Sequence, residues 1–233
     1  MAEISLTGDQ MLTALEIVAK EGPISVSEVA RAGDMNRTVA HRLLATLAQR
    51  GYIRRNADGF VVGPAVIHLA QKADMGLRSI ALPIMRALSG KIGETVVLHG
   101  INNHEAIVID QTLGEQNLVR VEHTPGSRHP LYVGASGWAL LAWQSEKLIA
   151  RATKAADATM IAARIQDVRA QGYAISHDEL QQGAHGIAAP ILLADGTCNF
   201  SLAILVPGIR AGMLPSLLPN LQNAALEIAA HLH

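Results

Sequence analysis

The order of apolar and polar residues in the first 63 positions predicts three helices followed by a short hairpin. Residues 10–20 carry apolar side chains at near-helical spacing, and a Gly-Pro pair shortly after them ends this first helix. Ser25 and Glu28 match the S-x-x-E capping box, in which each residue satisfies an amide donor of the other, so we expect a second helix from about residue 26 to residue 32. A third helix is expected over residues 36–50, with its valine, alanine and leucine residues on one side.

The opposite side of the third predicted helix is mostly polar. At helical spacing it presents Arg37, Thr38, His41, Arg42, Ala45 and Gln49. Two short strands follow at residues 52–55 and 60–63, separated by an Asn-Ala-Asp-Gly turn. Because a hairpin directly after a three-helix unit forms a wing, we expect a winged helix-turn-helix domain over residues 1–63.

The rest of the chain predicts a linker helix and a larger α+β domain. Residues 64–75 have helical periodicity, and we expect residues 64–76 to connect the first domain to a second one over residues 77–233. That second domain alternates strand-like and helical segments and contains two antiparallel hairpins, which favours a sheet flanked by helices. We expect helices at 77–92, 135–143, 158–171 and 213–232, strands at 94–101, 106–112, 117–123, from 172, 186–193 and 199–206, and a loop at 126–132.

The charged residues point to a function in only one stretch of the chain, residues 31–55. The formal net charge is −1, which argues against a chain that coats nucleic acid over its whole surface. Between residues 31 and 55, however, six arginines stand against one aspartate. Aromatic residues make up 3% of the chain and do not alternate with these arginines, so a stacking surface for single-stranded RNA is not expected and duplex DNA fits better.

The arginine-rich third helix is therefore the candidate DNA-reading element. A helix of this length fits the major groove, where arginine forms paired hydrogen bonds with guanine. We expect Arg37, Thr38, His41 and Arg42 to read bases, Ser25 and Ser27 to meet phosphates, and Arg54 and Arg55 on the wing to contact the backbone or the minor groove. The alternative is that these charges form only a solvated helix face.

The sequence gives little support for a disulfide, a metal site or a catalytic site. Cys198 is the only cysteine and lies in an apolar run, so it is expected to be a buried side chain, and neither a disulfide nor a cysteine-based zinc site can form within one chain. The ten histidines show no metal-binding spacing, and no nucleophile motif or phosphate-binding loop is present. We therefore expect no catalytic residue, no metal and no cofactor, and we expect the protein not to be an enzyme. No secretion signal or membrane-spanning run is evident, so we expect it in the cytoplasm.

Several ordered motifs resemble the IclR family of transcriptional regulators. The run TVAHRLLATLAQRGYIRRNADGFVVGP is similar to that family's recognition helix and wing. It is followed, in the family's order and spacing, by GETVVLHG, GSRHPLYVGASGWALLA and RAQGYAISHDELQQGAHGIAAPI. The resemblance covers nearly the whole chain. It implies a regulator, expected to be a repressor, whose GAF-like C-terminal domain binds a small organic-acid-like metabolite that controls operator affinity.

The resemblance also implies where an effector binds. The family's pocket positions fall here on Ala135, Ser136, Ser176, Gly186, Ile204 and Val206. Apart from the resemblance, His177 and His185 border a glycine loop, and we expect one of them to bind an effector carboxylate. Gly186 stands where a cysteine is common, Ile204 and Val206 where serines occur, and Trp138 where a lysine is usual. With fewer donors, the pocket is expected to take a larger or more apolar acid than a two-carbon one, such as an aromatic or sugar-derived acid.

The family further implies homodimers or homotetramers. We expect the first helix and the linker to dimerise the chain, because a palindromic operator on double-stranded DNA calls for a two-fold symmetric protein. The alternative function from the sequence is an enzyme or a small-molecule-binding module with an appended helical domain.

Overall fold

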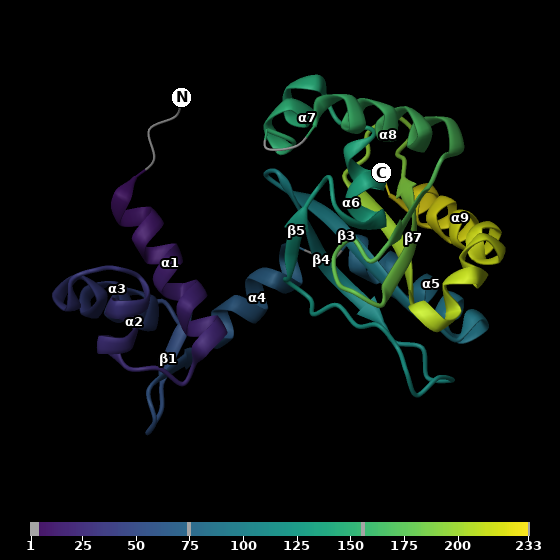
Figure 1. Cartoon of the computed structure of the whole chain (residues 1–233). Helices are drawn as coiled ribbons and strands as arrows, with labels where there is room; N and C mark the ends of the chain where they lie inside the picture. The colour runs from purple at the N-terminus through teal and green to yellow at the C-terminus, as the bar shows by residue number, and fades with distance from the viewer. Residues whose placement is uncertain (1–4, 74–75, 155–156, 233) are drawn as a thin grey trace. The chain divides into compact units, whose positions relative to one another are not determined.

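The computed structural model describes residues 5–73, 76–154 and 157–232. The chain divides into two compact units, Met1–Met75 and Gly76–His233 (Figure 1). Each unit has its own apolar core, as expected for domains that fold around separate clusters of buried side chains. None of the described helices is both long enough and apolar enough to span a membrane.

The first unit has the predicted helices and hairpin. It contains α1 (Leu6–Glu21), α2 (Val26–Ala32), α3 (Arg37–Gln49), β1 (Ile53–Arg55), β2 (Phe60–Val62) and α4 (Pro64–Ala73). The capping box is present: the Ser25 hydroxyl accepts from the Glu28 amide, and the Glu28 carboxylate accepts from the Ser25 amide. Helix α1 begins four residues earlier than predicted, because the Ser5 hydroxyl caps a first turn that has no apolar periodicity.

The second unit is one antiparallel sheet between two layers of helices. The sheet has the strand order β5-β4-β3-β8-β7-β6. Its strands are β3 (Thr95–Asn102), β4 (Glu105–Thr112), β5 (Arg128–Pro130), β6 (Ala174–His177), β7 (Ala184–Ile191) and β8 (Phe200–Pro207). Its helices are α5 (Leu77–Ile92), α6 (Gly134–Leu141), α7 (Glu146–Ala152), α8 (Ala158–Gln171) and α9 (Leu214–His231), with a 3₁₀ turn over Gly208–Met213.

Alternation along the strands divides the core of the second unit. One cluster joins the sheet to α6 and α8, and the other joins it to α5 and α9 (Figure 1). Leu202, Ile204 and Val206 of β8 lie in the α5/α9 cluster, whereas Ala203 and Leu205 lie in the α6/α8 cluster. This two-residue period decides which side chains can share a site.

The segment between β4 and β5 departs from the prediction. Residues 117–123 alternate like a strand but pair with no strand of the described structure. The edge strand next to β4 is β5 instead, and its His129 lies opposite Ala106. The loop predicted at residues 126–132 therefore contains this short strand. Helix α7 was not predicted, and Cys198 is buried as expected but precedes β8 rather than lying in it.

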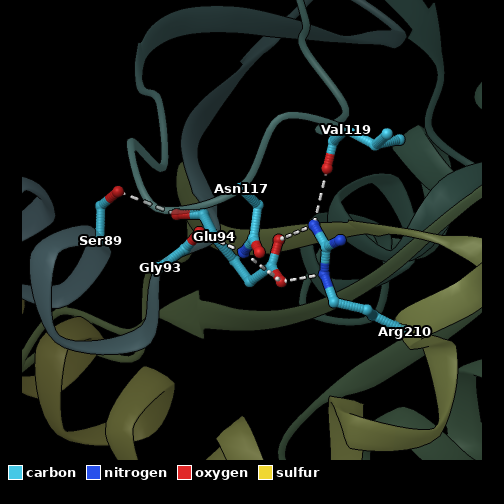
Figure 2. A network of polar contacts seen from close by, with 6 residues as sticks. All are labelled: Ser89, Gly93, Glu94, Asn117, Val119 and Arg210. Carbon is cyan, nitrogen blue, oxygen red and sulfur yellow. Dashed lines mark hydrogen bonds and ion pairs between the residues drawn. The ribbon is translucent and has the colours of Figure 1, made fainter.

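Side-chain contacts hold residues 117–123 in place of a strand ladder. Arg210 donates to both carboxylate oxygens of Glu94 and to the carbonyl of Val119, as Figure 2 shows. Asn117 donates to the carbonyl of Gly93 at 3.1 Å. At the far end of the segment, the His123 amide donates to the Gln111 side chain at 3.0 Å. Side chains from outside the segment, together with its own Asn117, thus fix its path.

Candidate functional site: a nucleic-acid interface and an effector site

The outward face of α3 is built by its cap and its buried stripe. The Asn36 side chain accepts from the Thr38 amide at 2.8 Å and so fixes the first turn. The buried residues Ala40, Leu43, Leu44 and Leu47 then turn one side of the helix inward. The opposite side is exposed along its length and presents Arg37, Thr38, His41, Arg42, Ala45 and Gln49. The predicted reading residues therefore share one accessible face.

Three arginines of this unit have no carboxylate partner in the part of the chain that the structure describes. Among the described residues, no ion pair involves Arg37, Arg42 or Arg54. Arg37 is the first residue of α3, and a cation there opposes the helix dipole. The described residues thus provide no carboxylate for Arg37, and its exposed guanidinium is available to an external anion.

The two predicted phosphate contacts on α2 lie beside that face. Ser25 and Ser27 are exposed, and Val26 between them lines a shallow hollow together with Arg37, Thr38 and His41. The Ser25 oxygen accepts from the Glu28 amide, and the hydroxyl and amide of Ser25 both act on the Glu28 carboxylate and lower its pKa, so Glu28 stays anionic. The Ser25 hydroxyl is thus already engaged in the cap, whereas Ser27 makes no side-chain hydrogen bond among the described residues.

The wing supplies two further cations. Arg54 and Arg55 lie on β1 with exposed side chains, and the Arg55 guanidinium stands 5.9 Å from the centre of the Phe60 ring. The Asn56 side chain accepts from the amides of Asp58 and Gly59 and so closes the turn between the strands. The wing arginines are therefore carried on a defined hairpin.

Around the start of α6, the second unit brings together four of the predicted effector residues. The Ala135 amide donates to the Ser176 hydroxyl at 2.9 Å. Gly186 faces the same place, because a side chain there would meet Ala135 at 3.7 Å and Leu205 at 3.1 Å. Ser136 follows on α6 and is buried. These residues come from the start of α6 and from strands β6 and β7, on the side of the sheet that α6 covers.

Glu179 is a part of this site that the sequence analysis missed. Its carboxylate accepts from the Gly134 amide at 2.8 Å and from the Trp138 indole at 2.9 Å. An acidic side chain therefore sits at the positive end of α6, where the free amides of a helix favour an anion. The run of acidic residues after β6 was the available signal, but nothing in the sequence showed that it folds back onto α6.

Ile204 and Val206 are not part of this group. Both are fully buried in the α5/α9 cluster, on the other face of the sheet from α6, and Ile204 lies opposite Val96 and Ile187. The expected positions are displaced by one residue along β8, because Leu205, between Ile204 and Val206, is the side chain on the face that α6 covers. His177 is exposed at the end of β6, where its Nδ1 lies 2.6 Å from Nδ1 of His185.

Three histidines lie close together on the same side of the sheet as α6. The His99 ring makes edge contacts with the rings of His123 and His129, with centres 6.0 Å and 5.5 Å apart. His129 Nδ1 lies 3.0 Å from the Pro130 carbonyl and must carry the proton, so its Nε2 accepts from the Ser136 hydroxyl at 3.3 Å. Within the described parts of the chain, no group of three or more histidine, cysteine, aspartate or glutamate residues is arranged to hold a metal ion.

Burial lowers the pKa of each of these histidines, and for His99 the neighbouring rings of His129 and His123 lower it further. Below about pH 6.5 these histidines take up protons in the unfolded chain but stay neutral in the folded protein. The free energy of unfolding is therefore highest above about pH 6.5 and decreases as the pH falls. We expect the unfolding free energy of the second unit to fall as the pH drops below about 6.5, by up to about 1.4 kcal/mol per pH unit for His99, whose pKa burial lowers furthest, and by less for His123 and His129.

Urea unfolding between pH 7.5 and 5.5 tests this expectation. Both tryptophans, Trp138 and Trp143, lie in the second unit and report its unfolding. The exposed His231 provides the matched control, and His231→Gln should keep the full pH dependence. Equal stability of the parent protein at the two ends of the range would show that the folded protein binds protons as readily as the unfolded chain, and would contradict the lowered pKa values.

Cys198 offers no nucleophile. Burial raises the pKa of its thiol to about 12, so the reactive thiolate is absent at neutral pH.

Comparison with known proteins adds a family context. Residues 9–57 match the model of the IclR helix-turn-helix domain, and residues 70–230 match the model of the bacterial transcriptional regulator IclR C-terminal domain. The HTH-type transcriptional regulator BhcR of Paracoccus denitrificans is 30% identical over 239 residues, covering 96% of this chain and 85% of that protein. The transcriptional repressor IclR of Escherichia coli is 30% identical over 152 residues, covering 60% of this chain and 53% of that protein.

A solved structure has the same fold. The IclR homolog from Microbacterium hydrocarbonoxydans, crystallised with 4-hydroxybenzoate, superposes with a TM-score of 0.85 at 21% identity, and the match covers 97% of this chain and 98% of that one. The winged unit and the sandwiched sheet thus recur together in a known protein.

Proposed function

The chain belongs to the IclR family of bacterial transcriptional regulators, and from that premise we propose a function for each of its two units. It is a DNA-binding transcriptional regulator with an effector-binding C-terminal domain. In our proposal, residues 1–63 bind DNA, residues 64–76 link the units, and residues 77–233 bind the effector and hold subunits together. Its named relatives are regulators, which favours this function over an enzyme with an appended helical domain.

The observation that carries the DNA-binding proposal is the single exposed face of α3. With Arg37, Thr38, His41 and Arg42 on that face and the leucines opposite, α3 can enter the major groove without disturbing its own core. Ser25 and Ser27 then approach one phosphate strand, and Arg54 and Arg55 approach the backbone or minor groove beside it. Two such units bound to one palindrome call for a dimer.

Exposed apolar side chains support dimerisation through α1 and α4. Leu6 and Leu12 on α1, and Ile67 and Leu69 on α4, are more than half exposed to solvent. Large exposed apolar side chains on two helices of one unit can be covered by a second subunit. We propose a homodimer through these helices, or a homotetramer made of two such dimers.

For the second unit, we propose an effector site around the start of α6, with Ala135, Ser136, Ser176, Gly186 and Leu205 as its lining. The ligand is an organic acid larger than two carbons, because the lining offers few donors and several apolar atoms. The fold can take an aromatic acid, since the Microbacterium homolog was crystallised with 4-hydroxybenzoate. His177 lies at the exposed end of β6, beside this group rather than within it.

We further propose that the protein represses transcription and that the acid releases it from DNA. The E. coli relative is named a repressor, and an effector shifts a two-state regulator only as far as it binds one state better. We place the protein with its DNA in the cytoplasm, and we propose that it catalyses no reaction and needs no cofactor.

The salt dependence of DNA binding tests the role of the wing. Replacing Arg54 with Ala should lower the slope of log K against log salt by about one, because one fewer phosphate charge is neutralised and one fewer counterion is released. The control is Arg151→Ala, which removes an equally exposed arginine from α7 in the other unit. Titrations by fluorescence anisotropy on a selected operator give both slopes, and equal slopes for the two variants would remove Arg54 from the interface.

A further inference from the structure

His99 is a buried polar side chain with unmet hydrogen-bonding capacity. It lies on β3, its side chain is fully buried, and neither ring nitrogen has a hydrogen-bond partner in the described parts of the chain. The Val97 carbonyl lies close enough to favour the protonated ring slightly, without the geometry of a hydrogen bond. Two unpaired nitrogens in one buried ring are costly, since each loses its bond to water and gains none.

The surroundings of His99 join it to the proposed effector site. Across the sheet, His99 lies between Val108 on β4 and Ser201 on β8. The Ser201 hydroxyl donates to the Ser136 carbonyl at 3.2 Å, and His129 connects the His99 ring to the Ser136 hydroxyl. The unpaired ring is therefore one contact away from α6.

Among the described residues, no carboxylate acts on His99. The titratable groups that act on His99 are His129 on β5 and His123 on the segment before it, and both oppose its protonation. Glu105 on β4 acts on His129 but has no resolved effect on His99. Asp110, the buried carboxylate of β4, lies opposite Leu98 on the other face of the sheet and binds Arg78. In a buried place lined by three neutral imidazoles and one hydroxyl, a proton that enters with an anion compensates its charge.

We propose that His99, with His129 and Ser136, forms an acid-binding subsite that takes the carboxylate of an organic-acid effector together with one proton from solvent. This inference rests on the effector-binding role proposed above and deepens it. The bound pair is carboxylate with imidazolium, or carboxylic acid with imidazole, and both forms hold one proton more than the separated carboxylate and neutral ring. The proton count is therefore the same whichever nitrogen or oxygen carries the proton.

Calorimetric titration of the full-length protein with benzoate tests the subsite. Titrations near pH 8 in buffers of different ionisation enthalpy give the number of protons taken up, which we expect to be about one per benzoate. Benzamide has nearly the same shape but no carboxylate, and we expect it to bind at least about tenfold more weakly, without proton uptake. Benzoate binding without proton uptake, or no binding of benzoate at tens of millimolar, would overturn the subsite.

His99→Leu is the matched variant. It removes both unpaired nitrogens at similar volume, so we expect it to fold and to melt a few degrees higher than the parent protein. Its affinity for benzoate should fall about 10- to 100-fold and its proton uptake should fall to near zero, whereas His231→Gln should change neither. Unchanged proton uptake in His99→Leu would overturn the assignment; His99→Gln, measured alongside, gives the same readout should the leucine variant misfold.

DNA binding is measured separately, so the two proposals fail in different ways. If benzoate binds with proton uptake but operator affinity does not change, the acid-binding subsite is supported and the control of DNA binding by this acid is contradicted. Release of DNA by an acid that binds without a proton and tolerates His99→Leu would uphold gating and contradict the subsite.

Discussion

Replacing Arg37 and Arg42 together with Ala is expected to lower operator affinity by roughly 30-fold to more than 10,000-fold, because a bidentate arginine–guanine contact contributes about 1–3 kcal/mol at each position. Both side chains are exposed on α3, and neither forms an ion pair among the described residues. Anisotropy titrations on the selected operator and on unrelated DNA measure the loss, which should be much larger on the operator.

The double variant should keep its fold. Arg37 opposes the dipole of α3, so its removal is expected to leave the melting temperature of the first unit unchanged or slightly raised. The control removes two exposed arginines from helices of the other unit, as Arg86→Ala with Arg151→Ala, and should retain operator affinity. A double Arg37/Arg42 variant that binds the operator as the parent does would leave α3 without a reading role.

Replacing Arg210 with Ala is expected to cost the second unit about 3–5 kcal/mol of unfolding free energy. Glu94 is 1% exposed, and Arg210 is the only cation in an ion pair with it among the described residues. Without the guanidinium, this carboxylate keeps only a weak contact with Asn117 at 3.4 Å, and the Val119 carbonyl loses its donor. The cost comes from leaving a buried charge unpaired.

Urea unfolding followed by tryptophan fluorescence measures this loss. Adding Glu94→Gln to Arg210→Ala should restore part of the stability, since the buried charge is then removed with its partner. The exposed contact between Lys91 and Asn220 provides the control, and Lys91→Ala should change stability by less than about 0.5 kcal/mol. A loss below about 1 kcal/mol in Arg210→Ala would show that solvent reaches Glu94.

The winged unit was predictable because its signals are local. The capping box at Ser25, the apolar stripe of α3 and the Asn-Ala-Asp-Gly turn each specify structure within a few residues. The outward face of α3 followed directly from helical spacing. The sequence did not predict the first turn of α1, where the Ser5 cap acts without apolar periodicity.

The second unit was harder because its site depends on pairing between distant segments. Residues 117–123 have the alternation of a strand, but Arg210, ninety residues later, and Gln111 bind the segment as a loop. Assigning Ile204 and Val206 to the effector site missed by one position, which in a strand is the difference between opposite faces. Glu179 and His99 come near the proposed site only through contacts with α6 and with the ring of His129, which link segments far apart in the sequence.

The central claim is that α3 reads bases in the major groove, and methylation interference tests it most directly. Methyl groups placed on guanine N7 of an operator selected from random DNA block arginine contacts there. We predict that such methylation prevents binding of the parent protein at symmetric guanines in the two half-sites, and that Arg37→Ala or Arg42→Ala loses the interference at one guanine per half-site. Binding that is indifferent to guanine N7 methylation, or an identical interference pattern in both variants, would contradict the claim.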